Sequence, residues 1–296
     1  MKDAISILLQ VAFLVNISPA LAGDIPLSKN VSVSIPADST LALVATKEKN
    51  ADRVLFNGEA LVSGMLQIYW QISWNCDGPS GCKEFPRTLG MRFFPDKKSL
   101  LSLPTMKEGK TVFEAKSIYL SNNRPGSDAH FPEEKIKTLL KDISNIPDNF
   151  FRYRERFVLF PAKIRFAGLA VSKECDSYHF IGTFLEVKEN AKELPPDQER
   201  EASELPAGCG PSLYDEVFIV RAKNSDKFEV RSSPDVKGAV ISRLQNDNAV
   251  LNLRTVNNNW LYIRAVPGDE PYSTNKKATP VFGYIYKPSL EMEPLN

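Results

Sequence analysis

The sequence predicts a mainly β protein with two folded domains: an N-terminal β-barrel or sandwich capped by one helix, and a smaller β-rich domain after it. Three observations support this. The chain has 296 residues, more than a usual single domain. Alternating apolar and polar residues recur through its N-terminal part. A charged segment rich in proline follows them. Hydrophobic residues make up 43% and charged residues 25% of the chain, which is globular usage and excludes coiled coils, collagens and disordered chains.

Strands dominate residues 24–188. Between residues 66 and 74 the apolar side chains alternate with Gln67, Tyr69, Gln71 and Ser73, and they are Leu66, Ile68, Trp70, Ile72 and Trp74. A period of two predicts a strand with one apolar face and one polar face. Further segments rich in β-branched and aromatic residues are expected to be strands, namely 89–94, 112–120, 157–171 and 178–187.

Two glycines interrupt these strands. Gly64 and Gly168 are both expected to mark a bulge or a tight bend. Around Gly168 the apolar positions change from even numbers, Ile164 and Phe166, to odd numbers, Leu169 and Val171. One extra residue at a bulge would keep all of them on the same face.

One helix is predicted after residue 131. Pro132 suits the first helical position, and Glu133 and Glu134 complement the positive end of the helix dipole. An apolar stripe follows at helical spacing, formed by Ile136, Leu139, Leu140 and Ile143. The stripe is expected to cover the sheet, and the alternative is a partner-binding stripe. Strands with one covering helix suggest a small barrel or sandwich, with an oligonucleotide/oligosaccharide-binding-type barrel as one candidate.

The first 22 residues predict export. A short basic start precedes a mostly apolar stretch, and Ala20-Leu21-Ala22 has the small-x-small pattern of a signal-peptide cleavage site. The stretch is too short to span a bilayer comfortably. Alternatives are a buried N-terminal helix or an uncleaved anchor. We therefore expect a periplasmic or secreted protein with no membrane span after cleavage.

Export makes disulfides the expected state of the four cysteines. Cys76 and Cys82 flank a stretch of turn residues that would bring them together. Three pairings are possible, and we favour Cys76–Cys82 with Cys175–Cys209. The alternative is a metal site or a redox pair, but the chain has neither C-x-x-C nor His-x-His spacing.

Residues 189–213 are predicted to be a linker. Pro195-Pro196 precedes a mostly acidic run, and Pro206, Gly208 and Gly210 follow it. The acidic run is expected to be a solvated surface, with no packed element. The predicted domains are therefore 23–188 and 214–292.

The C-terminal domain resembles bacterial SH3-like (SH3b) domains. The resemblance covers residues 214–292 and rests on the order and spacing of several short segments, namely Phe228–Pro234, Gly238, Val240-Ile241, Leu244, Val250-Leu251, Trp260–Ile263, Gly283–Tyr286 and Leu290. It implies a small SH3-like β-barrel. Two features depart from the family: the turn at 246–248 uses asparagine and aspartate, which also tolerate left-handed geometry, and the loop 267–280 is longer than usual.

Members of this family commonly bind peptidoglycan peptides or act as targeting or protein-interaction modules. The resemblance thus implies a partner in the cell envelope, either peptidoglycan or a protein. Alternation in 260–263 places Leu261 and Ile263 inward and the aromatic residues outward, although core packing is the favoured alternative for Trp260. Large rings with a polar handle suit recognition. The expected ligand-binding residues are Trp260, Tyr262, Tyr284 and Tyr286.

No catalytic motif, cofactor or metal site is predicted. The two histidines are assigned to ordinary positions, His130 to the surface and His179 to a strand. With 37 basic and 36 acidic residues, the chain lacks the basic field typical of nucleic-acid binding. The sequence thus predicts an exported, non-enzymatic binding protein. The alternatives are a periplasmic inhibitor or immunity-type protein acting through the 76–82 loop, and an unrecognised cell-wall hydrolase.

Overall fold

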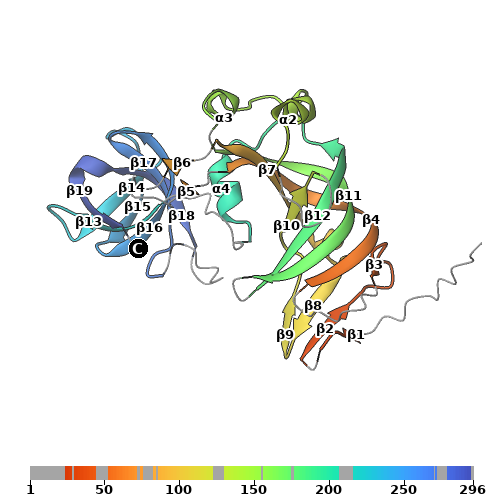
Figure 1. Ribbon diagram of the computed structural model, residues 1–296. Coiled ribbons are helices and arrows are strands. Elements are labelled where there is room, and N and C mark those ends of the chain that lie inside the picture. Colours follow the sequence, from red (N-terminus) through yellow and green to blue (C-terminus); the bar gives the residue numbers. More distant parts are fainter. Residues whose placement is uncertain are drawn as a thin grey trace, which may run out of the picture.

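The computed structural model describes residues 24–28, 30–44, 53–71, 74–75, 83–84, 86–122, 130–154, 156–174, 177–206, 216–269, 271 and 279–294. The predicted signal peptide, the four cysteines and most of the long 267–280 loop lie outside these residues. The described chain is mainly β, as the sequence predicts. It forms an N-terminal barrel and a separate C-terminal domain, with a short helix between them (Figure 1).

Five strands close the N-terminal barrel. Each pairs with the next in a ring, in the order β4 (Arg53–Gln71), β7 (Thr88–Pro95), β10 (Ile118–Ser121), β12 (Ser177–Asn190) and β11 (Phe157–Glu174), and β11 pairs back to β4. The β10–β12 pair is parallel and the other pairs are antiparallel. Two helices lie between β10 and β11, which are the third and fourth strands of the ring in chain order. The strand pairing closes on itself, so of the predicted alternatives, barrel or sandwich, the barrel is the one found, and its assignment to the oligonucleotide/oligosaccharide-binding type stays a prediction.

The barrel interior is filled from all five strands. Alternation in β4 points Leu66, Ile68 and Trp70 inward, as expected. A register shift occurs at Gly168, which has φ 59°, and both Phe166 and Leu169 reach the core. The bulge predicted there is confirmed. Of the two alternatives at Gly64, a bulge or a tight bend, the bulge is wrong, because β4 keeps its register with both neighbours around this residue.

Helices cover one end of the barrel. The predicted helix is α2 (Glu133–Leu140). Pro132 is its N-cap residue and not its first helical residue, so the helix begins one residue later than expected. Its stripe covers the core, with Ile136 and Leu140 fully buried. A second helix, α3 (Asp148–Arg152), places Phe150 in the same core. The expectation of a single capping helix is therefore wrong. The second helix was not predicted because five residues are too few to show a helical periodicity of apolar side chains.

Smaller elements extend the barrel at its other end. A four-stranded antiparallel sheet joins β1 (Asp24–Pro26), β2 (Val31–Ser34), β8 (Thr105–Glu108) and β9 (Thr111–Phe113) (Figure 1). Its Val33 and Met106 continue the barrel core. Strand β3 (Ala42–Leu43) pairs with β4, helix α1 (Lys97–Leu100) follows β7, and β5 (Trp74–Asn75) pairs with β6 (Lys83–Glu84).

The C-terminal domain is one curved antiparallel sheet around its own core. The strand order is β15 (Val240–Gln245), β14 (Lys227–Arg231), β18 (Val281–Tyr286), β17 (Trp260–Ala265), β16 (Asn248–Asn257), β13 (Glu216–Ala222) and β19 (Leu290–Pro294), with a 3-10 turn, η1 (Lys287–Ser289), before β19. Inward side chains include Val230, Leu261, Ile263 and Ile285. Asp247 adopts φ 65°, so the predicted turn at 246–248 is indeed left-handed.

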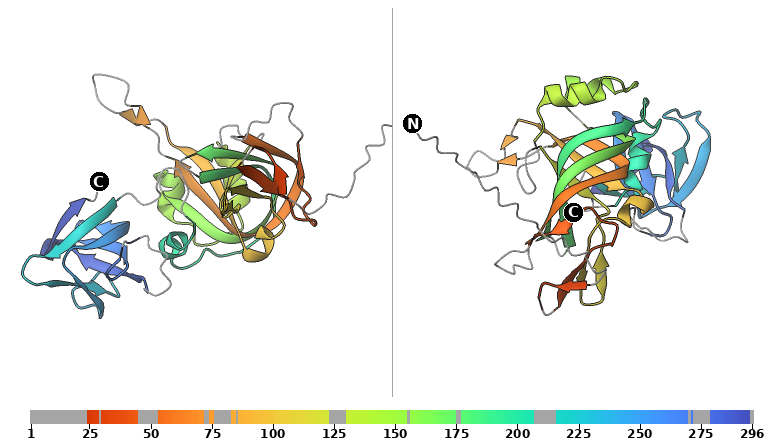
Figure 2. Two further views of the ribbon diagram at one scale, coloured as in Figure 1. Left: turned by 90° about the horizontal axis from the view of Figure 1, so that it is seen from below. Right: turned by 90° about the vertical axis from the view of Figure 1, so that its right-hand side faces the viewer.

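A helix stands in the segment predicted to be a linker. Helix α4 (Gln198–Ser203) begins at the N-cap Asp197, whose carboxylate accepts a hydrogen bond from the Arg200 amide at 3.1 Å. Two of its residues, Glu199 and Ala202, are buried. The expectation of a solvated acidic run without packed structure is therefore wrong. The helix lies between the barrel and the C-terminal domain (Figure 2).

Candidate binding site

The four predicted aromatic residues share the outward face of β17 and β18. Trp260 lies opposite Tyr286 and Tyr262 lies opposite Tyr284 in the strand register. Both ring pairs have centroids 5.0 Å apart. Leu261 points into the core, so the predicted alternation of faces holds. The expectation that the aromatic side is exposed is wrong for Trp260 and Tyr262, because both are buried. We call the outward surface of these four residues the aromatic face.

Helix α4 covers one end of the aromatic face. Tyr262 is only 6% exposed, and its hydroxyl donates a hydrogen bond to the Asp197 carboxylate. Arg200 places its guanidinium 5.0 Å from the centroid of the Phe282 ring, on the neighbouring strand. The Trp260–Tyr286 pair forms the other end of the face, with Trp260 buried and Tyr286 partly exposed.

Two arginines converge on a second carboxylate of α4. Glu199 is 8% exposed and accepts a hydrogen bond from Arg156 at 3.1 Å, while Arg254 lies 3.6 Å away. Arg254 also stacks over Tyr262, 5.3 Å from the ring centroid, and donates to the Tyr284 hydroxyl at 3.4 Å. Buried charges need partners of this kind, because desolvation disfavours an isolated carboxylate.

Arg156 connects the barrel directly to the C-terminal domain. It precedes β11 with φ 67°, a left-handed conformation uncommon outside glycine and asparagine. Its guanidinium donates to the Leu253 carbonyl oxygen at 3.4 Å as well as to Glu199. We call the set of Arg156, Asp197, Glu199, Arg254 and Tyr262 the α4 contact.

The α4 contact raises the pKa of the Tyr262 hydroxyl. Burial is the first cause, and the hydrogen bond to the anionic Asp197 is the second. Both disfavour the tyrosinate, the first by desolvation and the second by like charge. Tyr262 is therefore held as a neutral donor, which is the form that a carboxylate needs.

The opposite side of α4 packs on the barrel. Ala202 and Leu205 contact an apolar cluster on the outer face, formed by Met65, Tyr69, Phe157 and Leu159. The Gln198 side-chain amide accepts from the Leu159 amide at 2.6 Å and donates to the Leu159 carbonyl at 2.9 Å. Because β12 ends opposite Ala162, residues 157–161 of β11 have β4 as their only strand partner in the described chain. Gln198 takes the place of the missing strand at Leu159.

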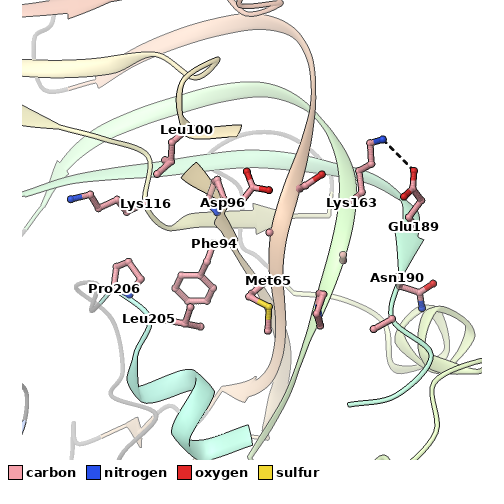
Figure 3. Close-up of a pocket in the computed structure, with 16 residues that line it drawn as sticks. Met65, Phe94, Asp96, Leu100, Lys116, Lys163, Glu189, Asn190, Leu205 and Pro206 are labelled. Atoms are coloured by element: carbon pink, nitrogen blue, oxygen red, sulfur yellow. Dashed lines mark hydrogen bonds and ion pairs between the residues drawn. The ribbon is translucent and has the colours of Figure 1, made fainter. Parts of the chain in front are cut away.

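An open pocket lies beside the end of α4 (Figure 3). Its volume is about 630 Å³. Met65, Phe94, Leu205 and Pro206 form an apolar wall, continuous with the cluster under α4. On its rim Lys163 pairs with Glu189 at 3.2 Å. The pocket therefore combines an apolar wall with four charged lining residues, Asp96, Lys116, Lys163 and Glu189.

A second group on the barrel surface was not predicted. Arg92, 6% exposed, lies against three rings, with Tyr119, Phe94 and Tyr69 centroids at 4.6, 5.7 and 5.9 Å from its guanidinium carbon. Ring faces stabilise a partly desolvated cation. The available signal was the strand register, which sets Arg92 opposite Tyr119 and Gln67, but register cannot be obtained from one strand alone.

The other residues considered from the sequence lie apart from the aromatic face. His130 is exposed before α2, and His179 is buried and stacks on Tyr119 with centroids 5.6 Å apart. All four cysteines, and with them the 76–82 loop, fall outside the described residues, so their pairing stays a prediction. Within the described ranges, His, Cys, Asp and Glu side chains form no group of three suited to a metal ion. No helix among the described residues is long and apolar enough to cross a membrane.

Replacing Tyr262 by phenylalanine should loosen α4. The ring and its packing remain, but the hydrogen bond to the Asp197 carboxylate is lost, and a bond to a charged group contributes about 1.5–3 kcal/mol. Hydrogen–deuterium exchange of the α4 amides should become about ten- to a hundredfold faster, since about 1.4 kcal/mol corresponds to tenfold. Tyr286→Phe, on the same face, is the matched control and should leave exchange in α4 unchanged. Equal exchange in the two variants would show that the hydroxyl of Tyr262 does not hold the helix.

Comparison with known proteins adds no relative. No family model matches the chain, and neither the curated proteins nor the solved structures contain a significant match.

Proposed function

We propose that the chain is an exported, non-enzymatic binding protein whose C-terminal SH3-like module recognises a peptide, carried by the cell wall or by an envelope protein. The observation that carries this proposal is the aromatic face. Four large aromatic side chains stand together on one side of β17 and β18 while the other side fills the core. Such clusters of rings with polar tips are favoured at recognition surfaces.

The strand pairing supports the SH3-like assignment. Segments that carry the resemblance lie next to each other in one sheet: β17 pairs with β18 along its whole length, and Arg231 of β14 lies opposite Tyr284. A Cβ on Gly283 would come within 2.7 Å of the Arg231 carbonyl oxygen. Glycine is thus required here for β14 to approach β18, and this approach sets the position of Tyr284.

The direct test is co-sedimentation of the full chain with purified peptidoglycan, compared with Tyr286→Ala. Tyr286 is partly exposed at the end of the face away from α4, so its removal should spare the fold. We expect binding to fall about tenfold, a typical loss of about 1.4 kcal/mol at an interface residue, with an unchanged melting temperature.

Tyr153→Ala is the control for this test, because Tyr153 is an exposed tyrosine on the barrel. It should bind like the unchanged chain. Equal loss in both variants, or undiminished binding by Tyr286→Ala, would place the wall-binding surface elsewhere than on the aromatic face.

A further inference from the structure

The α4 contact shows what chemistry the C-terminal face accepts. We propose that this face recognises acidic protein segments, and that α4 is an intramolecular occupant which such a partner displaces. This inference rests on the proposed binding function and specifies its partner.

The first argument is the pattern of carboxylates on α4. Asp197 and Glu199 are two residues apart, and each meets a different group of the C-terminal domain. Asp197 accepts from the Tyr262 hydroxyl, and Glu199 lies against Arg254. The face thus contacts two carboxylates in sequence. It contacts Asp197 through a neutral hydroxyl and Glu199 through the Arg254 guanidinium, while the shorter contact of Glu199 is with Arg156 of the barrel. Guanidinium is the group best suited to carboxylate geometry.

The second argument is charge complementarity. Strands β16, β17 and β18 contain the partly exposed Arg254 and the buried Arg264, and no aspartate or glutamate. Arg254 is moreover fixed by its stacking on Tyr262 and its hydrogen bond to Tyr284, so it is already oriented when an acidic segment arrives. A positive face of this kind favours acidic segments and disfavours basic ones.

The third argument is that α4 is suited to release. It has six residues, and isolated helices shorter than about 12 residues are marginal in water. The Arg156 and Arg254 side chains are partly exposed, so water can compete for the ion pairs with Glu199. Tethering nevertheless gives α4 a high effective concentration at the face, so a free partner must exceed it in affinity.

The test uses the full chain and a fluorescein-labelled peptide of residues 195–206 as the acidic probe, with binding followed by fluorescence anisotropy. In the unchanged chain α4 occupies the face. The variant D197N/E199Q weakens this occupant, and we expect it to bind the probe at least tenfold more tightly than the unchanged chain. A probe carrying the same two neutral substitutions should bind that variant at least tenfold more weakly than the acidic probe.

Two further variants locate the site. E201Q removes one negative charge from an exposed position of the same helix and should bind the probe no better than the unchanged chain. Adding Arg254→Gln to D197N/E199Q should abolish the gain in affinity for the acidic probe. If the double variant does not fold, as judged by its melting curve, D197N alone carries the same comparison.

Each other outcome overturns the inference. Equal binding of the acidic and neutral probes removes the role of the carboxylates. Undiminished probe binding after Arg254→Gln would mean that the probe binds elsewhere. If neither D197N/E199Q nor D197N binds the probe more tightly than the unchanged chain, α4 is a fixed structural element that a partner does not displace. Peptidoglycan binding that depends on Tyr286, together with any of these results, would leave the binding function intact and reject the acidic partner alone.

Discussion

Replacing Phe160 by alanine is expected to lower the free energy of unfolding of the N-terminal barrel by about 3–5 kcal/mol. Phe160 is 0% exposed and lies on β11 opposite Leu66, and its side chain belongs to the barrel core. Its removal takes away buried apolar area and leaves a cavity that five paired strands cannot collapse to fill. Calorimetry of the full chain should show the barrel transition moving to lower temperature.

Leu61→Ala is the matched control, since Leu61 is on β4 of the same barrel but is 51% exposed. Its effect should stay within about 0.5 kcal/mol. The transition of the C-terminal domain, whose core is built around Ile263, should move much less than that of the barrel. A single transition shifted as a whole by Phe160→Ala would contradict the separation into two cores.

Gly64→Ala is expected to destabilise the barrel by about 3 kcal/mol, the upper end of what overpacking usually produces. A Cβ at this position would lie 2.0 Å from the Phe94 carbonyl oxygen on the paired strand β7. The Phe94 oxygen belongs to the backbone and the position of the Cβ is fixed by the backbone of residue 64, so neither atom can turn away and the strands must separate. Urea unfolding of the variant measures the loss.

Gly109→Ala is the comparison for this prediction. Gly109 has φ 59°, but a Cβ there would meet no atom within 4 Å. Only left-handed strain is added, which costs about 1 kcal/mol. If Gly64→Ala were as mild as Gly109→Ala, the close approach of β4 and β7 would not be the reason for glycine at position 64.

The fold was predictable wherever one strand carried its own signal. Alternation in β4 identified the inward Leu66 and Ile68, and the change of phase at Gly168 identified the bulge. Ring closure and the parallel β10–β12 pair were not predictable, because both depend on which strands meet. Gln67 and Tyr69 were expected on a polar face, yet both are buried, and Tyr69 packs in the cluster that α4 covers.

The grouping of the aromatic residues was also predictable, because alternation within 260–263 is a local property of the strand. The covering of the aromatic face by α4 was not predictable. Its apolar contribution is only Ala202 and Leu205, within an acidic segment between prolines, so neither periodicity nor composition indicates a packed helix. The fixing of Tyr262 by Asp197 joins residues 65 positions apart, and no local pattern predicts such a bond.

The two hydrogen bonds between Gln198 and Leu159 bear on whether this strand edge can pair with another chain. An uncovered strand edge is a template on which another chain can add a strand, and residues 157–161 carry apolar side chains beside such an edge. The Gln198 amide blocks this edge by bonding the same donor and acceptor that an incoming strand would use. Release of α4 would therefore unblock a β-strand edge at the same time as it clears the aromatic face, and self-association would become sensitive to the same event as partner binding.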